Sequence, residues 1–107
     1  MDYFIAIFTK NKEYLNFIKD KNLIILNDDN EIIDSYQAKD NIFFDYLITD
    51  DLETLRKLNV IIDDNIALTN FDLQTSIENV FAFGKAINSS LSIEKQLEQI
   101  YQFIFEN

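Results

Sequence analysis

The sequence predicts a small three-layer α/β domain, in which helices cover a mostly parallel sheet and one β-hairpin is added. Three observations carry this prediction: short apolar runs without polar alternation, a strand-helix-strand order at the start, and an amphipathic stretch at the end. Runs that are apolar on both faces are typical of strands in parallel sheets. The 107 residues fit a single domain, 1–107, since domains commonly contain about 100–150 residues.

The N-terminal part predicts a strand, a helix and a second strand. Residues 3–8 are aromatic and β-branched, and residues 23–26 form another apolar run. Between them, apolar residues at helical spacing predict a helix over residues 12–21, which Thr9 or Asn11 can cap. A helix that joins two buried strands is the usual start of an α/β sheet.

The next stretch contains a turn and a third strand. Short Asn and Asp side chains predict a turn at residues 27–30. Residues 31–38 favour a short strand or an edge hairpin, and the pattern leaves both open. Residues 41–49 predict a third buried strand. An edge strand around residues 32–33 could pair between two copies of the chain, so a homodimer is one expectation.

A short helix and a hairpin follow the third strand. Asp50 and Glu53 resemble a capping box for a helix that Asn59 can end. Two apolar runs flank the polar residues 63–65. This arrangement predicts a β-hairpin over residues 60–68.

The last third of the chain predicts a strand and a helix. Residues 69–78 form a polar connection broken by Phe71 and Leu73, and residues 79–83 predict a buried strand that ends at Gly84. An amphipathic helix then closes the chain, and its apolar stripe consists of Ile93, Leu97, Ile100, Tyr101 and Ile104.

Three further features concern this final helix. Ser90 or Ser92 can cap it. Phe103 and Phe105 fall off the apolar stripe. We expect these two rings either to cover another edge of the core or to form an exposed apolar patch that binds a partner.

Composition excludes many kinds of site. The chain contains no cysteine, no histidine, no proline and one glycine. Without these residues it cannot form the usual zinc site, a thiol redox pair, a Ser-His-Asp triad or a Gly-rich phosphate loop. We therefore expect no catalytic residue and no metal site. Acidic clusters at 28–31, 50–53 and 63–64 lie where turns and caps are needed, and predict those structural roles.

The charge balance limits the partners. Nine Lys and Arg against nineteen Asp and Glu give a net charge of -10. Such a chain repels polyanions, whereas nucleic-acid binding requires a basic surface. The longest apolar run, residues 3–8, is far shorter than the roughly 20 residues that span a bilayer. We expect a cytoplasmic protein with no nucleic-acid or membrane partner.

A longer pattern begins at residue 59. A hairpin leads through a threonine-serine loop and a valine-phenylalanine-alanine strand to a glycine and a last helix; the matching residues are Thr75, Ser76, Val80, Phe81, Ala82 and Gly84. In this order they resemble the closing stretch of the FAD domain of thioredoxin-reductase-like pyridine nucleotide-disulfide oxidoreductases. The resemblance implies a Rossmann-like, FAD/NAD(P)-binding-like fold in a shortened form.

The departures from that family bear on function. Glu78 and Asn79 stand where the family has proline and glycine, and Lys85 stands where an aspartate contacts the flavin dinucleotide. Residues 9–12 replace the glycine fingerprint, so the backbone cannot approach a pyrophosphate closely. The redox cysteines are absent as well.

Three hypotheses follow from this resemblance. In the first, a thioredoxin-reductase-related protein without cofactor or redox catalysis acts as an interaction or assembly module, with a protein partner or a second copy. In the second, the chain is a residual flavin or nucleotide binding module: Lys85 faces a phosphate near Gly84, while Thr9 and Asn11 offer a hydroxyl and an amide. In the third, it is one subunit of a split flavoprotein reductase. We favour the first, because chemistry cannot replace the missing glycines and cysteines.

Overall fold

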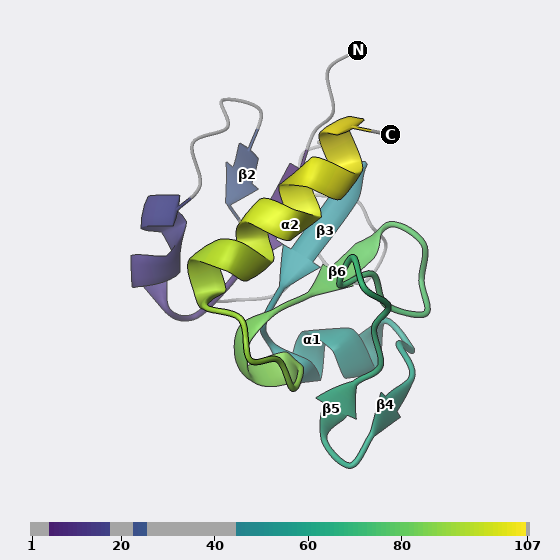
Figure 1. The fold of residues 1–107 in the computed structure, drawn as a ribbon. Coiled ribbons are helices and arrows are strands. Elements are labelled where there is room, and N and C mark those ends of the chain that lie inside the picture. The colour runs from purple at the N-terminus through teal and green to yellow at the C-terminus, as the bar shows by residue number, and fades with distance from the viewer. Residues whose placement is uncertain (1–4, 18–22, 26–44, 107) are drawn as a thin grey trace.

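The computed structural model describes residues 5–17, 23–25 and 45–106 (Figure 1). Its strands are β1 (Ile5–Phe8), β2 (Leu23–Ile25), β3 (Tyr46–Thr49), β4 (Ile62–Asp63), β5 (Ile66–Ala67) and β6 (Val80–Ala82). One sheet has the order β2-β1-β3-β6, with every neighbouring pair parallel, and β4 and β5 form a separate antiparallel pair. The predicted α/β class, with a mostly parallel sheet and a hairpin, is confirmed.

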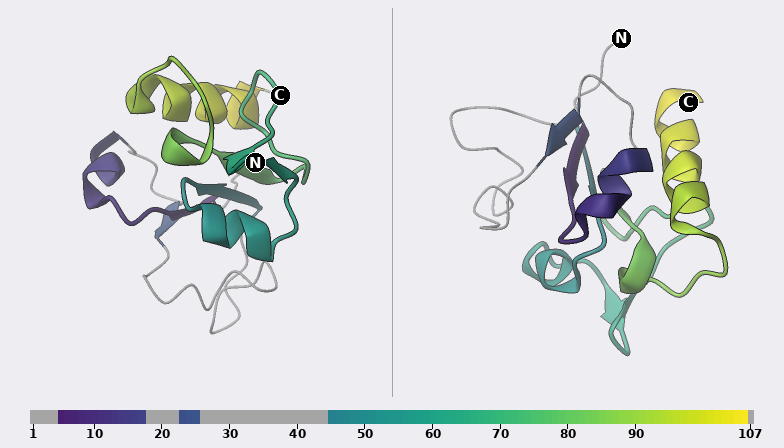
Figure 2. Two further views of the ribbon diagram at one scale, coloured as in Figure 1. Left: turned by 90° about the horizontal axis from the view of Figure 1, so that it is seen from below. Right: turned by 90° about the vertical axis from the view of Figure 1, so that its left-hand side faces the viewer.

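Helices lie on both faces of the sheet. They are η1 (Lys12–Phe17), α1 (Leu52–Lys57), η4 (Gly84–Ala86) and α2 (Ile93–Glu106). The helices η1 and α2 contact each other, and α1 lies across the sheet from α2 (Figure 2). All four residues of β1 are fully buried, as an apolar strand requires when both faces of its sheet are covered.

The helix predicted over residues 12–21 is a 3-10 helix where the structure describes it. The side-chain Oδ1 of Asn11 accepts the Glu13 N–H at 3.1 Å, and its carbonyl accepts the Tyr14 N–H at 3.1 Å. The second of these bonds spans three residues, which is the geometry of a 3-10 turn. Asn11, one of the two predicted caps, therefore starts this element.

The cap of α1 differs from the prediction by one residue. Oδ2 of Asp51 accepts the Thr54 N–H at 3.1 Å and the Thr54 hydroxyl at 2.7 Å. The prediction that Asp50 caps this helix is wrong, because the Asp50 side chain accepts a hydrogen bond from Thr9 instead. Asn59 follows the helix with a φ of 64°, a conformation that commonly ends helices.

The hairpin lies where the sequence predicts it, with short strands. Ile62 pairs with Ala67, and Asp63 pairs with Ile66. The two residues between the strands, Asp64 and Asn65, have φ angles of 53° and 61°. A two-residue turn of this kind requires positive φ at both positions, which Asp and Asn tolerate.

The segment before β6 pairs with that strand. Leu73 accepts the Ala82 N–H at its carbonyl at 3.1 Å, and Thr75 donates its N–H to the Val80 carbonyl at 2.9 Å. Residues 73–75 therefore run along the edge of β6 that faces away from β3. The polar side chains of this segment predict a connection and give no sign of the pairing. The pairing is made by backbone groups, which every residue type has.

The final helix packs its predicted stripe against the sheet, and the stripe residues with 2% exposure or less are Leu97, Ile100 and Ile104. Ser92 caps α2 by accepting the Lys95 N–H at 3.2 Å. The two rings off the stripe differ. Phe103 lies 5.7 Å from the Phe81 ring, between centroids, whereas Phe105 remains half exposed.

Several predicted elements lie outside the described residues. These are the turn at 27–30, the ambiguous stretch at 31–38 with its proposed edge at 32–33, and the start of the third strand at 41–44. Within the described ranges, no helix combines the length and apolar character needed to cross a membrane.

Candidate functional site

Three residues from distant parts of the sequence meet at one edge of the sheet. Thr9 follows β1, Asp50 follows β3, and Gly84 lies two residues after β6. Because the strands are parallel, their carboxyl ends share this edge. The strand order reverses between β1 and β3, and open α/β sheets commonly bind ligands at such a switch point. Two of the four predicted binding residues, Thr9 and Gly84, thus lie beside Asp50.

Asp50 is the buried carboxyl of this edge, and sequence reasoning assigned it only to a helix cap. It is 3% exposed. Its Oδ2 accepts the Thr9 hydroxyl at 3.0 Å, while Oδ1 has no hydrogen-bond partner in the described part of the chain. Burial raises the pKa of Asp50 above its ordinary value of 3.8, although the Thr9 hydrogen bond and the Lys85 charge oppose the shift. A buried, half-satisfied carboxyl destabilises the fold.

The other predicted residues have partners within the chain. Asn11 donates its backbone N–H to the Thr9 hydroxyl oxygen at 3.1 Å, and its side chain caps η1. Lys85 is exposed, and its charge acts on Asp50. Lys10 lies 3.9 Å from Asp51, between Nζ and Oδ1. The basic side chains at this edge therefore interact with carboxylates of the same chain.

Gly84 is held by α2. Its φ of 61° lies in the left-handed region, and a Cβ there would lie 3.3 Å from both Asp50 Cβ and Ile93 Cδ1. Its N–H donates to Gln96 Oε1 at 2.6 Å, and Gln96 Nε2 donates to the Leu91 carbonyl at 2.8 Å. Gln96 therefore occupies the backbone donor that a ligand at Gly84 would use.

Sequence reasoning missed Gln96. A glutamine among the charged residues of an amphipathic helix predicts a position in solvent, yet Gln96 is 3% exposed. Helical spacing gives one signal, because Gln96 lies three residues after Ile93 and four before Ile100, beside the apolar stripe, whereas the exposed Gln102 lies on the opposite face. Its role arises only because the chain after β6 folds back against α2.

Two of the donors that a phosphate would use at this edge are engaged. The Thr9 hydroxyl donates to Asp50, and the Gly84 N–H donates to Gln96. The buried side chain between them is a carboxyl, which repels phosphate when ionised. This arrangement does not fit the pyrophosphate of a flavin dinucleotide. Cofactor binding by Gly84, Lys85, Thr9 and Asn11 stays a prediction for measurement. Among the described residues, no cluster of side chains is arranged to hold a metal ion.

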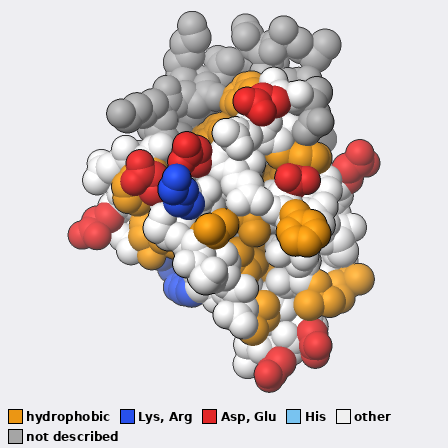
Figure 3. All heavy atoms as spheres, in the orientation of Figure 1, with side chains coloured by type: hydrophobic (Ala, Val, Ile, Leu, Met, Phe, Trp, Pro, Cys, Tyr) orange, Lys and Arg blue, Asp and Glu red, His pale blue; other side chains and the backbone are white. Residues whose placement is uncertain are grey.

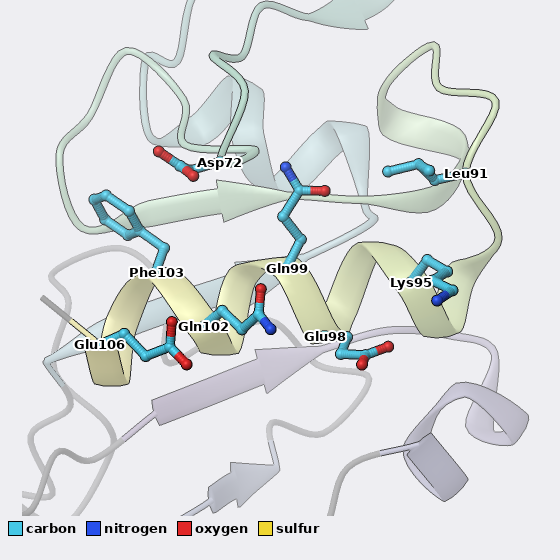
Figure 4. A pocket seen from close by; sticks show the side chains of 8 residues that line it. All are labelled: Asp72, Leu91, Lys95, Glu98, Gln99, Gln102, Phe103 and Glu106. Atoms are coloured by element: carbon cyan, nitrogen blue, oxygen red, sulfur yellow. The ribbon is translucent and has the colours of Figure 1, made fainter.

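A second feature is an open groove of about 660 Å³ beside α2 (Figure 4). Glu98, Phe103 and Glu106 line it from the helix, while Asp72 and Leu91 line it from the preceding loops. Phe103 and Leu91 lie toward opposite ends of the groove (Figure 4). We call this feature the α2 groove.

The loop beside the α2 groove presents Phe71 to solvent. Phe71 is 93% exposed. Asn70 Oδ1 accepts the backbone N–H groups of Asp72 and Gln74 at 2.9 and 3.0 Å. Gln99 of α2 donates a side-chain N–H to the Phe71 carbonyl. The Asn70 bonds hold the backbone of the loop on both sides of Phe71, and the Gln99 bond connects the loop to α2.

Leu73 anchors the same loop in the core. It is 6% exposed and has a φ of 65°. The left-handed conformation costs a leucine roughly 1–2 kcal/mol, and burial of its side chain, which contributes roughly 1.5–3 kcal/mol, offsets that cost. The core contact therefore defines the loop conformation, and with it the position of Phe71 two residues earlier.

The surface around α2 combines apolar and acidic side chains. On this face hydrophobic groups gather near the helix, with several carboxylates around them (Figure 3). Among the described residues, the large hydrophobic ones that remain exposed are Phe17, Ile61, Leu68, Phe71, Leu91 and Phe105. Phe71 and Leu91 belong to the two loops that flank the α2 groove. Scattered apolar side chains are ordinary on surfaces, and these two are distinguished by their position beside the groove.

The chain matches no family model, no curated protein and no solved structure. The sheet edge at Asp50 and the α2 groove are therefore interpreted from their own geometry.

Proposed function

We propose that this chain is a protein-interaction or assembly module related to thioredoxin-reductase-like flavoproteins, without redox catalysis of its own. The observation that carries this proposal is Phe71, 93% exposed on a hydrogen-bonded loop beside the α2 groove. A loop backbone already held by hydrogen bonds loses less conformational entropy when a partner binds there than a free loop would. Aromatic residues are common among those that dominate binding energy at interfaces.

The order of elements supports the relation to these flavoproteins. After β3 the chain continues through α1, the β4–β5 hairpin, β6 and α2, which is the order that the resemblance implies. Thr75 and Ser76 lie in the loop before β6, as the pattern requires. A parallel sheet in the order β2-β1-β3-β6 is also what a Rossmann-like fold with few strands would have.

The side chains available support a role without catalysis. Disulfide reduction requires a reactive thiol pair, and this chain has no cysteine. The donors nearest to the predicted cofactor position are engaged by Asp50 and Gln96. The residual-cofactor and split-reductase hypotheses therefore have less support than a protein-binding role.

Site-specific crosslinking in the source cells tests the binding role. With a photo-crosslinking phenylalanine analogue in place of Phe71, we expect a discrete adduct between this chain and another protein. The matched control places the same analogue at Ile61, which is 57% exposed and does not line the α2 groove. Equal crosslinking at both positions, or none at position 71, would contradict the proposal.

The cofactor hypothesis predicts a different result for the purified protein. We expect a natively purified sample to show no flavin absorption and to release no nucleotide on denaturation, as measured by visible spectroscopy and mass spectrometry. The reason is that the Gly84 N–H and the Thr9 hydroxyl already have partners. Release of stoichiometric flavin or nucleotide would instead support the residual-cofactor hypothesis.

A further inference from the structure

We propose that the α2 groove binds a cationic segment of a partner protein, one that also carries apolar side chains to contact Phe71 and Leu91. This inference rests on the proposed protein-binding function and deepens it by naming the chemistry of the partner. It is carried by the charge of the groove, the apolar residues beside it and the net charge of the chain.

The charge of the groove favours a cation. Its lining includes three carboxylates, Asp72, Glu98 and Glu106, and one ammonium group, Lys95. The remaining polar lining consists of glutamines from α2, which are neutral. An excess of negative charge in a concave surface concentrates field lines, which attracts positively charged ligands.

Acidic residues also follow one row of α2. Glu94, Glu98 and Glu106 are exposed and are separated by four and eight residues, so they lie on one side of the helix. Like charges four residues apart, as in Glu94 and Glu98, repel each other and destabilise a helix. A cationic partner would relieve that repulsion, and its lysine or arginine side chains would find carboxylates along the helix.

Apolar contacts are available beside these charges. Phe71 is 93% exposed and Leu91 is 43% exposed. Phe103 lines the groove while packing against Phe81. A bound segment that alternates basic and apolar side chains would satisfy the carboxylates and bury the exposed rings together.

The net charge argues against three other occupants. A second copy of this chain would bring a net charge of -10 against another of -10, and its own acidic groove would repel this one. An anionic membrane surface or an acidic protein would be repelled for the same reason. We therefore assign the groove to a cationic segment and treat self-association as an outcome of the test.

Peptide titration tests this assignment on the complete chain. The probe is an amphipathic peptide of leucine and lysine with the 14-residue length of α2. Two matched peptides replace every lysine by glutamate or every leucine by serine. Binding is followed by amide chemical shifts, which locate the contacts, and by fluorescence anisotropy, which gives the affinity. We expect the leucine-lysine peptide alone to bind at the α2 groove, with an affinity that falls as salt rises.

Variants separate a specific site from general charge attraction. Phe71→Ser, and separately Glu98→Gln with Glu106→Gln, are each expected to weaken binding about tenfold or more. The controls remove equivalent groups elsewhere: Ile61→Ser takes away an exposed apolar side chain, and Asp63→Asn with Asp64→Asn takes away two exposed carboxylates. We expect the controls to change the affinity less than about twofold.

Each other outcome would overturn the assignment. Equal loss in groove and control variants would mean general charge attraction. Binding of the leucine-glutamate peptide at the groove, or no binding of any peptide, would exclude a cationic partner, and concentration-dependent dimerisation through the groove would identify a second copy as the occupant. Crosslinking at position 71 distinguishes failure of this inference from failure of the proposed function. An adduct with another protein but no binding of the cationic peptide refutes only the partner chemistry. The absence of any adduct refutes the protein-binding function.

Discussion

Replacing Gln96 by alanine is expected to lower the free energy of unfolding by about 3 kcal/mol. Gln96 is 3% exposed, and its amide bonds both the Gly84 N–H and the Leu91 carbonyl. The substitution removes both hydrogen bonds at once. The Gly84 N–H and the Leu91 carbonyl must then bind water or remain unsatisfied. Each such group costs roughly 1–3 kcal/mol when buried. Urea unfolding followed by circular dichroism measures the loss.

Gln102→Ala is the matched control for this prediction. It removes the same side chain from the same helix, at an exposed position. Glutamine and alanine have similar helix propensities, so its stability should change by no more than about 0.5 kcal/mol. Equal effects of the two substitutions would show that Gln96 does not connect α2 to Gly84 in solution.

Replacing Asp50 by asparagine is expected to have the opposite sign and to stabilise the protein by about 2 kcal/mol at neutral pH. Asp50 is buried, and its Oδ1 has no hydrogen-bond partner among the described residues. The asparagine amide oxygen can still accept the Thr9 hydroxyl, which the carboxylate accepts at 3.0 Å. The substitution therefore removes a buried charge and keeps its hydrogen bond, and the expected gain is what remains after the cost of burying the new amide N–H groups.

The pH dependence of this effect has a defined direction. Burial raises the pKa of Asp50 in the folded protein above 3.8, the ordinary value expected for the unfolded chain. Between those two pKa values the folded state holds a proton that the unfolded state has released, so stability falls as pH rises. The stability advantage of Asp50→Asn over the parent chain should thus grow as the pH rises above about 4 and level off above the folded-state pKa of Asp50.

Asp51→Asn is the control for Asp50→Asn. It removes one negative charge at the neighbouring position, where the carboxylate caps α1 by accepting the Thr54 N–H and hydroxyl. Asparagine is about as good a cap as aspartate, so no gain in stability is expected. If both variants gain equally, the cause is the net charge of -10 and not the burial of Asp50. Unfolding midpoints across the pH range distinguish these results.

Local patterns determined the main elements of this fold. The apolar run over residues 3–8 leads to β1, and positive-φ-tolerant Asp64 and Asn65 lead to the hairpin turn. The stripe of α2 follows its helical spacing. Each of these features depends on neighbours within a few residues, and for that reason sequence periodicity and turn chemistry predict it.

Local patterns were less decisive where two neighbouring side chains suit the same role. Asp50 and Asp51 are adjacent, and each has the chemistry of an N-cap. Contact of Asp50 with Thr9, forty-one positions earlier, leaves Asp51 to cap α1. The choice between them is a tertiary effect, since it requires β1 and β3 to be neighbours.

The sequence by itself determined the class of this protein: an acidic α/β domain without the side chains for thiol or histidine chemistry. Only the tertiary structure decided what lies at its surfaces. It pairs the Gly84 N–H with Gln96 and leaves the Phe71 ring exposed on the loop beside α2. The physical reason is that composition and periodicity depend on neighbouring residues, whereas exposure and hydrogen-bond partners depend on segments brought together from distant parts of the chain.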